Sequence, residues 1–535
     1  MTVTTLDSAK KIRSGKRTKT ASMGSKTSSS NAPSIHPIEP ISIEDCVASR
    51  RLIHNTAYHQ FNAFEIEQIQ NNLLKWYDAE QRTNMPWRKP TRSDLDRKAL
   101  GQRAYEVWVS EIMLQQTQVA TVIDYYNRWM TAFPSIFDLA AADIEQVNTL
   151  WAGLGYYSRA KRLWEGAKKV VKEFDGILPN NAKDLEKHIP GVGPYTAGAI
   201  ASIVFGQQTS LVDGNVIRVL ARLRSIGADM KKANVIELFW QIATTLVPSE
   251  RPGDFNQALM ELGARICSPQ NPNCDGCPIQ TQCSALVQLR LHGELLSKDG
   301  GFWNQKETAA LIEHDCKYCP AITKDLDHDE YSVTRYPVKA DKKPPRDEEC
   351  AVSIVEKIPC EGTDDGLSEG SLYLISRRPD KGLLAGLWEF PSLELDNKQT
   401  TYEQRSTLSS TFLKNQYNLD LMDGTLDVKK QDLGNVVHLF SHIRKVYHIE
   451  WISISSSILK QTSTEQTKWI TMDELKTAPI PTGLKKAIKL LEKAQGRSSS
   501  SSSSSRFGNN NNKRKQPPSS SGSKNITSFF QKRAR

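Results

Sequence analysis

The spacing of apolar residues along the chain changes from a helical to a strand-like period. Between about residues 61 and 285, apolar residues recur three and four positions apart, as in IEQIQNNLLKWYDAE, and Pro and Gly turns separate these stretches. From about residue 347 to 494, apolar and polar residues alternate, as in CAVSIVEK and GSLYLISRR, with helix-like segments between them. The pattern predicts an all-α domain over 56–285 and a separate α+β domain over 346–495.

The segments that flank these domains lack either period. Residues 1–55 are rich in Ser, Thr, Lys and Pro, so we expect a disordered basic tail. Residues 286–345 lose the clear pattern and end in KADKKPPRDEE, which is typical of an interdomain connector. Residues 496–535 contain eight consecutive serines and a run of Asn, which predicts a low-complexity tail.

The composition narrows the partners and the compartment. Lys and Arg number 70 against 60 Asp and Glu, a net charge of +10, which favours a polyanionic partner. No stretch approaches the roughly 18 apolar residues of a membrane span, and no secretory segment follows Met1, so we expect an intracellular protein without a membrane partner. The basic cluster between Lys10 and Lys19 fits a nuclear signal, a mitochondrial presequence fragment or a solvated charge run, and KRK at 513–515 fits a nuclear signal.

A glycine turn followed by a single carboxylate stands out in the helical region. Gly191, Val192 and Gly193 open a helix, and the glycines allow a partner to approach the backbone closely. The N–H groups of a helix N-terminus can bind one phosphate, and Asp213 follows about one helix and loop later. This arrangement suggests an enzyme that holds a nucleic-acid backbone. An ordinary turn between helices is the alternative.

Glu111 lies in the apolar stretch WVSEIMLQQTQVATV and shares a helix face with Gln115. Burying an ionised carboxylate among apolar residues is costly, so its pKa should rise, which suits a general acid. A surface glutamate near a helix start is the alternative.

The chain has nine cysteines, and two groups of them have metal-ligand spacing. Four with the spacing C-x6-C-x2-C-x5-C follow a predicted helix directly, which favours metal ligation in a reducing compartment over disulfides. Zinc is one metal that such a set can hold. Cys316 and Cys319 form a second C-x2-C beside His314, either part of a zinc site or two surface thiols. The set of four is Cys267, Cys274, Cys277 and Cys283.

Several longer motifs occur in order: MPWRK (85–89), EIMLQQT, GLGYYSRA (153–160), the hairpin 191–197, VDGNVIRVLAR (212–222) and ALMELGARIC (258–267). Together they resemble the adenine DNA glycosylases of the MutY type, within the helix-hairpin-helix DNA glycosylase superfamily. The resemblance covers about 60–495. It implies a helix-hairpin-helix domain with an iron–sulfur loop, and a base excision repair enzyme that hydrolyses the bond to adenine mispaired with 8-oxoguanine and, less well, with guanine.

The resemblance also assigns roles, in which Glu111 protonates adenine N7 and Asp213 stabilises the cationic sugar. Its expected catalytic set is Glu111, Asp213, Tyr195 and Asn215. The residues expected to line the adenine pocket or to wedge into the duplex are Arg82, Trp87, Glu261, Gln116 and Tyr156. The glycine turn would bind DNA phosphate, and the four clustered cysteines would hold a [4Fe–4S] cluster. In animal relatives the connector also holds a zinc, to which Cys316 and Cys319 would correspond.

Tyr195 separates two classes of relative. Endonuclease III-like lyases, which act on oxidised pyrimidines, have at this position a lysine that attacks the sugar. A tyrosine there predicts a monofunctional glycosylase with water as the acceptor. A non-catalytic DNA-damage binding protein is a further alternative, although such a protein has no chemical need for both Glu111 and Asp213.

The second domain resembles the Nudix fold through GLLAGLWEFPS (382–392). Nudix hydrolases need a following helix with paired carboxylates that hold Mg²⁺, and residues 401–419 lack them. The resemblance therefore implies an 8-oxoguanine recognition domain, with Phe440, Ser441 and His442 as the reading residues. The alternative is that these three residues belong to an ordinary strand.

The C-terminal segment SKNITSFF (523–530) resembles the motif by which repair proteins bind the replication sliding clamp. Ile526, Phe529 and Phe530 fit that motif, but Ser523 stands where glutamine is usual. A hydrophobic end of a disordered tail is the alternative. We expect a monomer in the nucleus, with the mitochondrion as a second compartment.

Overall fold

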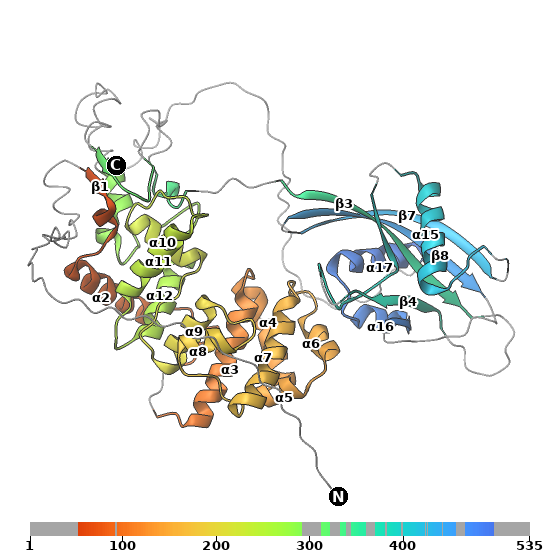
Figure 1. The fold of residues 1–535 in the computed structure, drawn as a ribbon, viewed down its shortest axis with the longest axis horizontal. Helices are drawn as coiled ribbons and strands as arrows, with labels where there is room; N and C mark the ends of the chain where they lie inside the picture. Colours follow the sequence, from red (N-terminus) through yellow and green to blue (C-terminus); the bar gives the residue numbers. More distant parts are fainter. Residues whose placement is uncertain are drawn as a thin grey trace, which may run out of the picture. The chain divides into compact units, whose positions relative to one another are not determined.

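The computed structural model divides the chain into two compact units, Met1–Ala140 with Glu165–Lys342 and Ala141–Trp164 with Lys343–Arg535 (Figure 1). No helix that it describes has both the length and the apolar character needed to cross a membrane. The described residues are 52–90, 94–290, 312–320, 332–338, 344–359, 370–379, 382–396, 400–422, 424, 426–440, 442–455 and 466–496.

Most of residues 63–265 are helical, as predicted. The helices are α2 (Ala63–Glu80), α3 (Arg97–Leu114), α4 (Val119–Ala132), α5 (Ile136–Ala141), α6 (Ile144–Trp151), α7 (Ser158–Phe174), α8 (Ala182–His188), α9 (Pro194–Phe205), α10 (Gly214–Leu223), α11 (Ala233–Leu246) and α12 (Pro252–Arg265).

Local sequence signals set where several of these helices begin. Asn62 forms a capping box with Glu65 at the start of α2, because each side chain accepts a hydrogen bond from the other residue's backbone N–H. Pro194 begins α9, where its missing N–H costs nothing. Asp213 caps α10. The hydrogen bonds that begin α10 therefore also fix the position of Asp213 at its N-terminus.

Helix α3 is the central helix of the first unit. Every residue from Ala104 to Met113 is buried, which is typical of a helix surrounded by protein on all sides. Its neighbours include α4 and α9, and α9 also packs against α12. Because Glu111 lies near the C-terminal end of this buried stretch, it is carried into the interior beside α9.

A second part of the core joins α2, α10, α11 and α12 to the connector. Leu73, Leu220, Phe239 and Phe255 are buried together there. The connector adds Cys319, Val333 and Tyr336 to the same cluster. Part of the connector therefore belongs to the helical core. Nothing in the sequence indicated this, because isolated contact residues leave no repeating pattern.

The segment that precedes α2 also departs from the sequence-based expectation. Disorder was expected through residue 55, but β1 (Leu52–Asn55) pairs in parallel with β2 (Ile312–Asp315), and a 3-10 helix, η1 (Thr56–His59), follows. Strands of four residues are too short for alternation to be recognised, and their partner is distant in sequence. The connector also contains η4 (Val333–Arg335).

The second unit contains the predicted α+β domain. Its sheet has the order β5-β4-β3-β8-β7, with β6 pairing β3 and β9 pairing β4, and β3 and β8 are parallel over their whole length. The strands are β3 (Arg346–Ile358), β4 (Leu372–Arg377), β5 (Trp388–Glu389), β6 (Ser392–Leu395), β7 (Asp427–Leu439), β8 (Ile443–Ser455) and β9 (Thr467–Thr471). The helices are α15 (Tyr402–Tyr417), α16 (Met472–Thr477) and α17 (Thr482–Ala494).

Helices cover this sheet on both faces (Figure 1). On one face Val352 and Ile354 pack with Leu484 and Leu491 of α17. On the other face Val355 packs with Leu413 of α15. Since side chains alternate along a strand, neighbouring residues of β3 supply the two cores.

Candidate active site and metal centres

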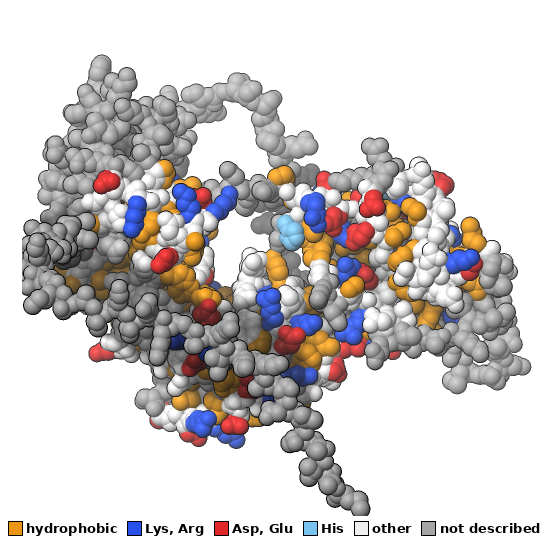
Figure 2. Space-filling view, in the orientation of Figure 1, with side chains coloured by type: hydrophobic (Ala, Val, Ile, Leu, Met, Phe, Trp, Pro, Cys, Tyr) orange, Lys and Arg blue, Asp and Glu red, His pale blue; other side chains and the backbone are white. Residues whose placement is uncertain are grey.

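The side chains on one face of the molecule do not form a single positive surface. Figure 2 shows Lys and Arg interspersed with Asp and Glu among the described residues of that face. Because opposite charges in close alternation largely cancel at a distance, the net charge alone does not locate a DNA-binding site.

One cavity in the first unit gathers most of the residues that the sequence singled out. Its volume is about 490 Å³, and α3, α9, α10, α12 and the segment before α3 line it. The predicted residues among its lining are Arg82, Trp87, Glu111, Gln116, Tyr195, Asp213, Asn215 and Glu261. Residues separated by more than 170 positions in the sequence therefore form one site.

Glu111 is a buried carboxyl group in the wall of this cavity, with 5% of its surface exposed. The hydroxyl of Tyr195 donates a hydrogen bond of 2.7 Å to its Oε2. Burial raises the pKa of Glu111 to about 7, with a further upward contribution from the charge of Asp213, while the Tyr195 hydrogen bond and Arg88 act in the opposite direction. This carboxyl group can hold a proton near neutral pH, as a general acid requires.

Tyr195 acts on Glu111 as a hydrogen-bond donor. Its hydroxyl also lies 3.2 Å from the Sδ of Met260, a contact that the sequence did not indicate. Burial, followed by the negative charges of Glu111 and Asp213, raises the pKa of Tyr195 well above its ordinary value. The phenol therefore remains protonated.

Asp213 is held at the N-terminus of α10 by three donors. Its Oδ1 accepts hydrogen bonds from the backbone N–H groups of Asn215 and Val216 at 2.9 and 2.8 Å. Its Oδ2 accepts one from Nδ2 of Asn215 at 2.7 Å. These bonds fix the orientation of the carboxylate without a side chain from another helix.

A polar chain extends from Asp213 toward the cysteine loop. Arg218 Nη2 donates to Oδ1 of Asn215 at 2.8 Å, and its Nε donates to the carbonyl of Cys267 at 2.8 Å. The backbone of Gly263 lies so close to Asn215 that a Cβ at this position would be 2.8 Å from the Asn215 Cβ. The carboxylate of Asp213 and the first clustered cysteine are thus connected through two side chains.

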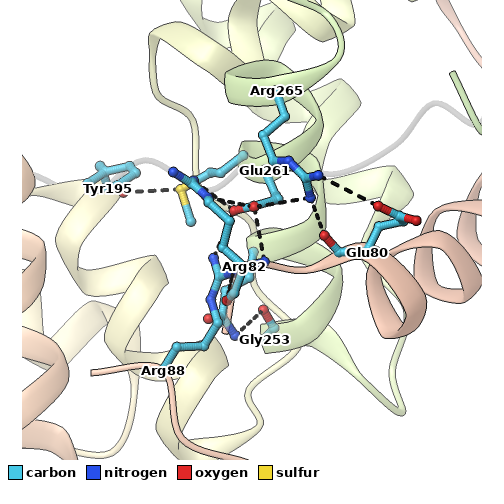
Figure 3. Close-up of polar contacts among 9 residues, drawn as sticks. Glu80, Arg82, Arg88, Tyr195, Gly253, Glu261 and Arg265 are labelled. Carbon is cyan, nitrogen blue, oxygen red and sulfur yellow. Dashed lines mark hydrogen bonds and ion pairs between the residues drawn. The ribbon is translucent and has the colours of Figure 1, made fainter. Parts of the chain in front are cut away.

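At another part of the cavity, Glu261 is paired with arginines (Figure 3). Arg82 donates to both of its oxygens, at 2.7 and 2.8 Å, and Arg88 donates to Oε2 at 3.1 Å. Burial opposes ionisation of Glu261, but Arg82 and Arg88 outweigh it and keep the pKa of Glu261 below its ordinary value. The sequence had not assigned a role to Arg88, although it directly follows Trp87, and its buried Nε has no hydrogen-bond partner.

The glycine turn directly precedes α9. Gly191 has φ of 79°, a backbone conformation that favours glycine, and Gly193 is the N-cap of the helix. A Cβ built on Gly193 would meet nothing within 4 Å, so the turn is open on that side. Val192 packs inward and is buried. Tyr195 lies in the first turn of α9, so an anion at the turn would bind next to the cavity.

Two of the predicted duplex-contacting residues have left-handed backbone conformations. Gln116, in the first unit, is exposed and has φ of 57°. Tyr156, in the second unit, is 46% exposed and has φ of 49°, with the guanidinium of Arg159 5.4 Å from its ring centre. Positive φ is uncommon for residues other than glycine and is concentrated at functional sites.

The four clustered cysteines line a small cavity of about 30 Å³ directly after α12. Arg222 braces this loop, because its Nη1 lies 3.2 Å from the Sγ of Cys267 and donates to the carbonyl of Ser268 at 2.7 Å. Burial raises the pKa of both Cys277 and Cys283 to about 12. Four thiols held around one cavity, with a cation beside the first, make this loop a candidate metal site.

The spacing of these sulfur atoms argues against a single zinc ion. Among the described residues, the one set of three or more ligand atoms within 4.8 Å of one another lies elsewhere. A zinc ion with four Zn–S bonds of about 2.3 Å brings its sulfurs to about 4 Å from one another. The four cysteine sulfurs contribute no such compact set, so the loop does not have the close spacing of a zinc site.

The compact set of ligand atoms is His59, Cys316 and Cys319. Nε2 of His59 lies 3.2 Å from Sγ of Cys316 and 3.4 Å from Sγ of Cys319, and Nδ1 lies 3.0 Å from the carbonyl of Arg224. His59 and Cys319 are buried, so the alternative of two surface thiols is wrong. The sequence had identified only the two cysteines, and the histidine that meets them comes from η1.

Known proteins match both units. Residues 109–244 match the HhH-GPD superfamily base excision DNA repair protein family, and residues 367–490 match the NUDIX domain family. The chain is 44% identical over 437 residues to the adenine DNA glycosylase of Rattus norvegicus, which covers 82% of this chain and 80% of the relative. It is 43% identical to that of Homo sapiens (82% and 77% covered) and 37% identical to that of Arabidopsis thaliana (80% and 64% covered).

The chain belongs to the adenine DNA glycosylase family. It is therefore a base excision repair enzyme that acts on DNA, and the 490 Å³ cavity is the candidate active site of this adenine DNA glycosylase. The prediction of a helix-hairpin-helix glycosylase domain joined to a Nudix-like domain is confirmed.

The expected reading residues of the glycosylase lie at the turn between β7 and β8. The backbone N–H of Phe440 donates to the carbonyl of Ile443 at 2.8 Å and closes this turn. Phe440 is half-buried and His442 is exposed, while Ser441 lies outside the described residues. Ile526, Phe529 and Phe530, expected to bind the sliding clamp, also lie outside them.

Proposed function

We propose that the enzyme hydrolyses the N-glycosidic bond of adenine mispaired with 8-oxoguanine and, less well, with guanine. The observation that carries this proposal is the pairing, in one cavity, of a buried carboxyl group that holds a proton near neutral pH with a carboxylate fixed at a helix N-terminus. Adenine must leave the base stack to enter such a cavity, at a cost of a few kcal/mol that is lowest at a mispair.

The two acids divide the chemistry. Glu111 donates its proton to N7 of adenine, which makes the base a better leaving group. Asp213 stabilises the positive charge that develops on the sugar, as paired carboxylates do in glycoside hydrolysis. Asn215 holds Asp213 in place. Trp87 with the arginine-paired Glu261 supplies the walls and polar edge of the adenine pocket.

The test is release of free adenine from a duplex with one adenine opposite 8-oxoguanine, followed by alkaline cleavage at the abasic site. We expect strand breaks only after alkali. A protein that binds this duplex tightly but releases no adenine would instead be a non-catalytic damage-binding protein.

The enzyme is monofunctional on this proposal. Tyr195 stands where the lyases have lysine, and no lysine is found among the described residues that line the cavity. A phenol that stays protonated is not a nucleophile for the sugar. Treatment of the reaction with borohydride should therefore trap little protein on DNA. Trapping of most of the enzyme would contradict the proposal.

Cys267, Cys274, Cys277 and Cys283 hold a [4Fe–4S] cluster on this proposal, supported by the four thiols around one cavity and by the neighbouring Arg222. When bound, the cluster orders the loop after α12 and contributes no redox chemistry on the substrate. The purified protein should be brown and contain about four irons per chain. Colourless, iron-free protein that is folded and active would contradict this assignment.

His59, Cys316 and Cys319 hold zinc, with one position left for a further ligand. The bond between Nδ1 of His59 and the Arg224 carbonyl orients the ring so that Nε2 faces the sulfurs. His59→Ala should lose one zinc per chain, retain its iron and unfold at a lower temperature, as measured by metal analysis and thermal denaturation.

The matched control for that variant is His188→Ala, because His188 contacts Phe174 and belongs to no set of thiol ligands among the described residues. It should keep its zinc. Equal zinc content in His59→Ala and the unaltered protein would contradict the assignment.

The Nudix-like domain recognises 8-oxoguanine through Phe440, Ser441 and His442. Helix α15 supports recognition over hydrolysis, because its sequence carries one carboxylate, Glu403, rather than the pairs that hold Mg²⁺. Ser441→Ala combined with His442→Ala should reduce the preference for adenine opposite 8-oxoguanine over adenine opposite guanine. An unchanged preference would rule out the reading role.

The C-terminal residues Ile526, Phe529 and Phe530 bind the replication sliding clamp on this proposal. The enzyme is a monomer, located in the nucleus and also in the mitochondrion. The clamp motif in the sequence supports the clamp-binding part of the proposal. Binding of the full chain to the purified clamp should disappear in Phe529→Ala/Phe530→Ala, and equal binding by both proteins would rule the motif out.

A further inference from the structure

The end of β7 presents aromatic residues on one face. Val436, His438 and Phe440 alternate with the exposed Val437 and Leu439, so strand geometry places the first three on the same side. The rings of His438 and Phe440 are in edge contact, with centroids 4.6 Å apart and an angle of 80° between their planes. Phe440 therefore rests against His438 rather than projecting from the turn alone.

The first turn of α17 fixes His438 from the other side. A Cβ built on Gly483 would lie 3.2 Å from Cγ of His438, which is closer than ordinary contact, so the helix backbone is packed directly against this ring. Nζ of Lys486 donates to the carbonyl of Val437 at 3.1 Å. Val436 is buried in the core that α17 shares with the sheet. The ring that supports Phe440 is thus anchored to the body of the domain.

His438 packs as a neutral aromatic ring. Burial, followed by the charge of Lys486, lowers the pKa of His438 below its ordinary value. Its partner across the β7–β8 pair is Lys445, whose ammonium group is paired with Glu394 and Glu348. The charge that acts on the ring is thus the cationic Lys486 of α17, which does not favour a protonated imidazole.

We propose that His438 is a positioning residue, which holds Phe440 in the orientation needed to read the base opposite adenine. This inference rests on the proposed recognition of 8-oxoguanine and adds a residue to it. An aromatic side chain that enters a base stack binds more tightly when its orientation is set beforehand, because less freedom is lost on binding.

The variant that tests this is His438→Ala, which leaves Phe440 in place but removes its support. Since an edge contact between rings contributes about three- to tenfold in an equilibrium, the preference for the 8-oxoguanine mispair should fall by about that factor. The measurement is the dissociation constant for duplexes in which an uncleavable adenine analogue lies opposite 8-oxoguanine or guanine. The single-turnover rate at saturating enzyme should stay within about twofold of the original, because Glu111 and Asp213 are unaltered.

Two further variants separate positioning from general loss of structure. His438→Phe keeps a neutral ring against Phe440 and should restore most of the preference. Gly483→Ala introduces a methyl group 3.0 Å from Cε2 of Tyr447 and 3.2 Å from Cγ of His438, so it should shift the His438 ring and reduce the preference while His438 and Phe440 stay unsubstituted. The matched control is Val437→Thr, on the exposed face of the same strand, which should behave as the unaltered protein.

Phe440→Ala distinguishes failure of this inference from failure of the proposed reading function. If Phe440→Ala keeps the full preference, the reading role itself is wrong. If Phe440→Ala loses it while His438→Ala and Gly483→Ala both keep it, the positioning role alone is overturned. If His438→Ala does not fold, Gly483→Ala and His438→Phe provide the test. In that case, loss of the preference for the 8-oxoguanine mispair in His438→Phe would count against the inference.

Discussion

Replacing Asp213 with asparagine should slow adenine release by about 10²–10³-fold, the usual effect of removing one electrostatic partner of a transition state. Asparagine is also a good N-cap, so the bonds from the backbone of Asn215 and Val216 to its Oδ1 can persist and α10 should remain folded. The substitution therefore removes mainly the negative charge. Single-turnover release of free adenine measures the effect.

Asp96→Asn is the matched control. Asp96 caps the N-terminus of α3 through a bond to the backbone of Ala99, but it does not line the cavity. This variant should release adenine at the original rate. A loss of similar size in both variants would mean that the effect of Asp213→Asn comes from helix capping and not from charge.

Replacing Glu111 with glutamine should lower the rate by about 10²–10⁴-fold, the range that a positioned acid supplies. Glutamine preserves the shape of the side chain and can still accept the hydrogen bond from Tyr195, but it has no proton to donate to N7. Binding of the duplex should change much less than the rate, because the variant removes an interaction that matters only as the bond breaks. A variant that releases adenine at the original rate would exclude Glu111 as the acid.

The same substitution should change how stability depends on pH. The pKa of Glu111 in the folded protein, about 7, exceeds its ordinary value of 4.5. The stabilising contribution of the protonated group is therefore complete below about pH 4.5 and is lost as the pH rises through 7. Glu111→Gln should consequently unfold at a higher temperature than the unaltered protein at pH 8, with a smaller difference near pH 5. A lower unfolding temperature for Glu111→Gln than for the unaltered protein at pH 8 would mean that burial does not disfavour the ionised form of Glu111.

Periodicity predicted much of the fold because most elements are long enough to show it. Helix α3 is such a case, although its apolar pattern left open whether Glu111 would be buried or lie on the surface. The assembly of the cavity was not predictable in this way. The contact of Tyr195 with Glu111 joins residues 84 positions apart, and resemblance to a family, not local pattern, brought them together.

The candidate zinc site shows where prediction from the sequence fails. His59 lies 257 residues before Cys316, in a 3-10 helix of four residues that carries no periodic signal. Arg88 was overlooked for a different reason. An arginine beside a tryptophan suggests only a surface charge. Its partner, Glu261, lies 173 positions later in the sequence.

The most direct test of the central claim is the rate of adenine release, in single turnover, as a function of pH for the unaltered enzyme and for Glu111→Gln. Because the protonated carboxyl is the active form, the rate of the unaltered enzyme should fall as the pH rises through about 7, and the slower variant should lack this fall. A rate that is independent of pH across this range, or the same alkaline fall in Glu111→Gln, would contradict the assignment of Glu111 as the acid.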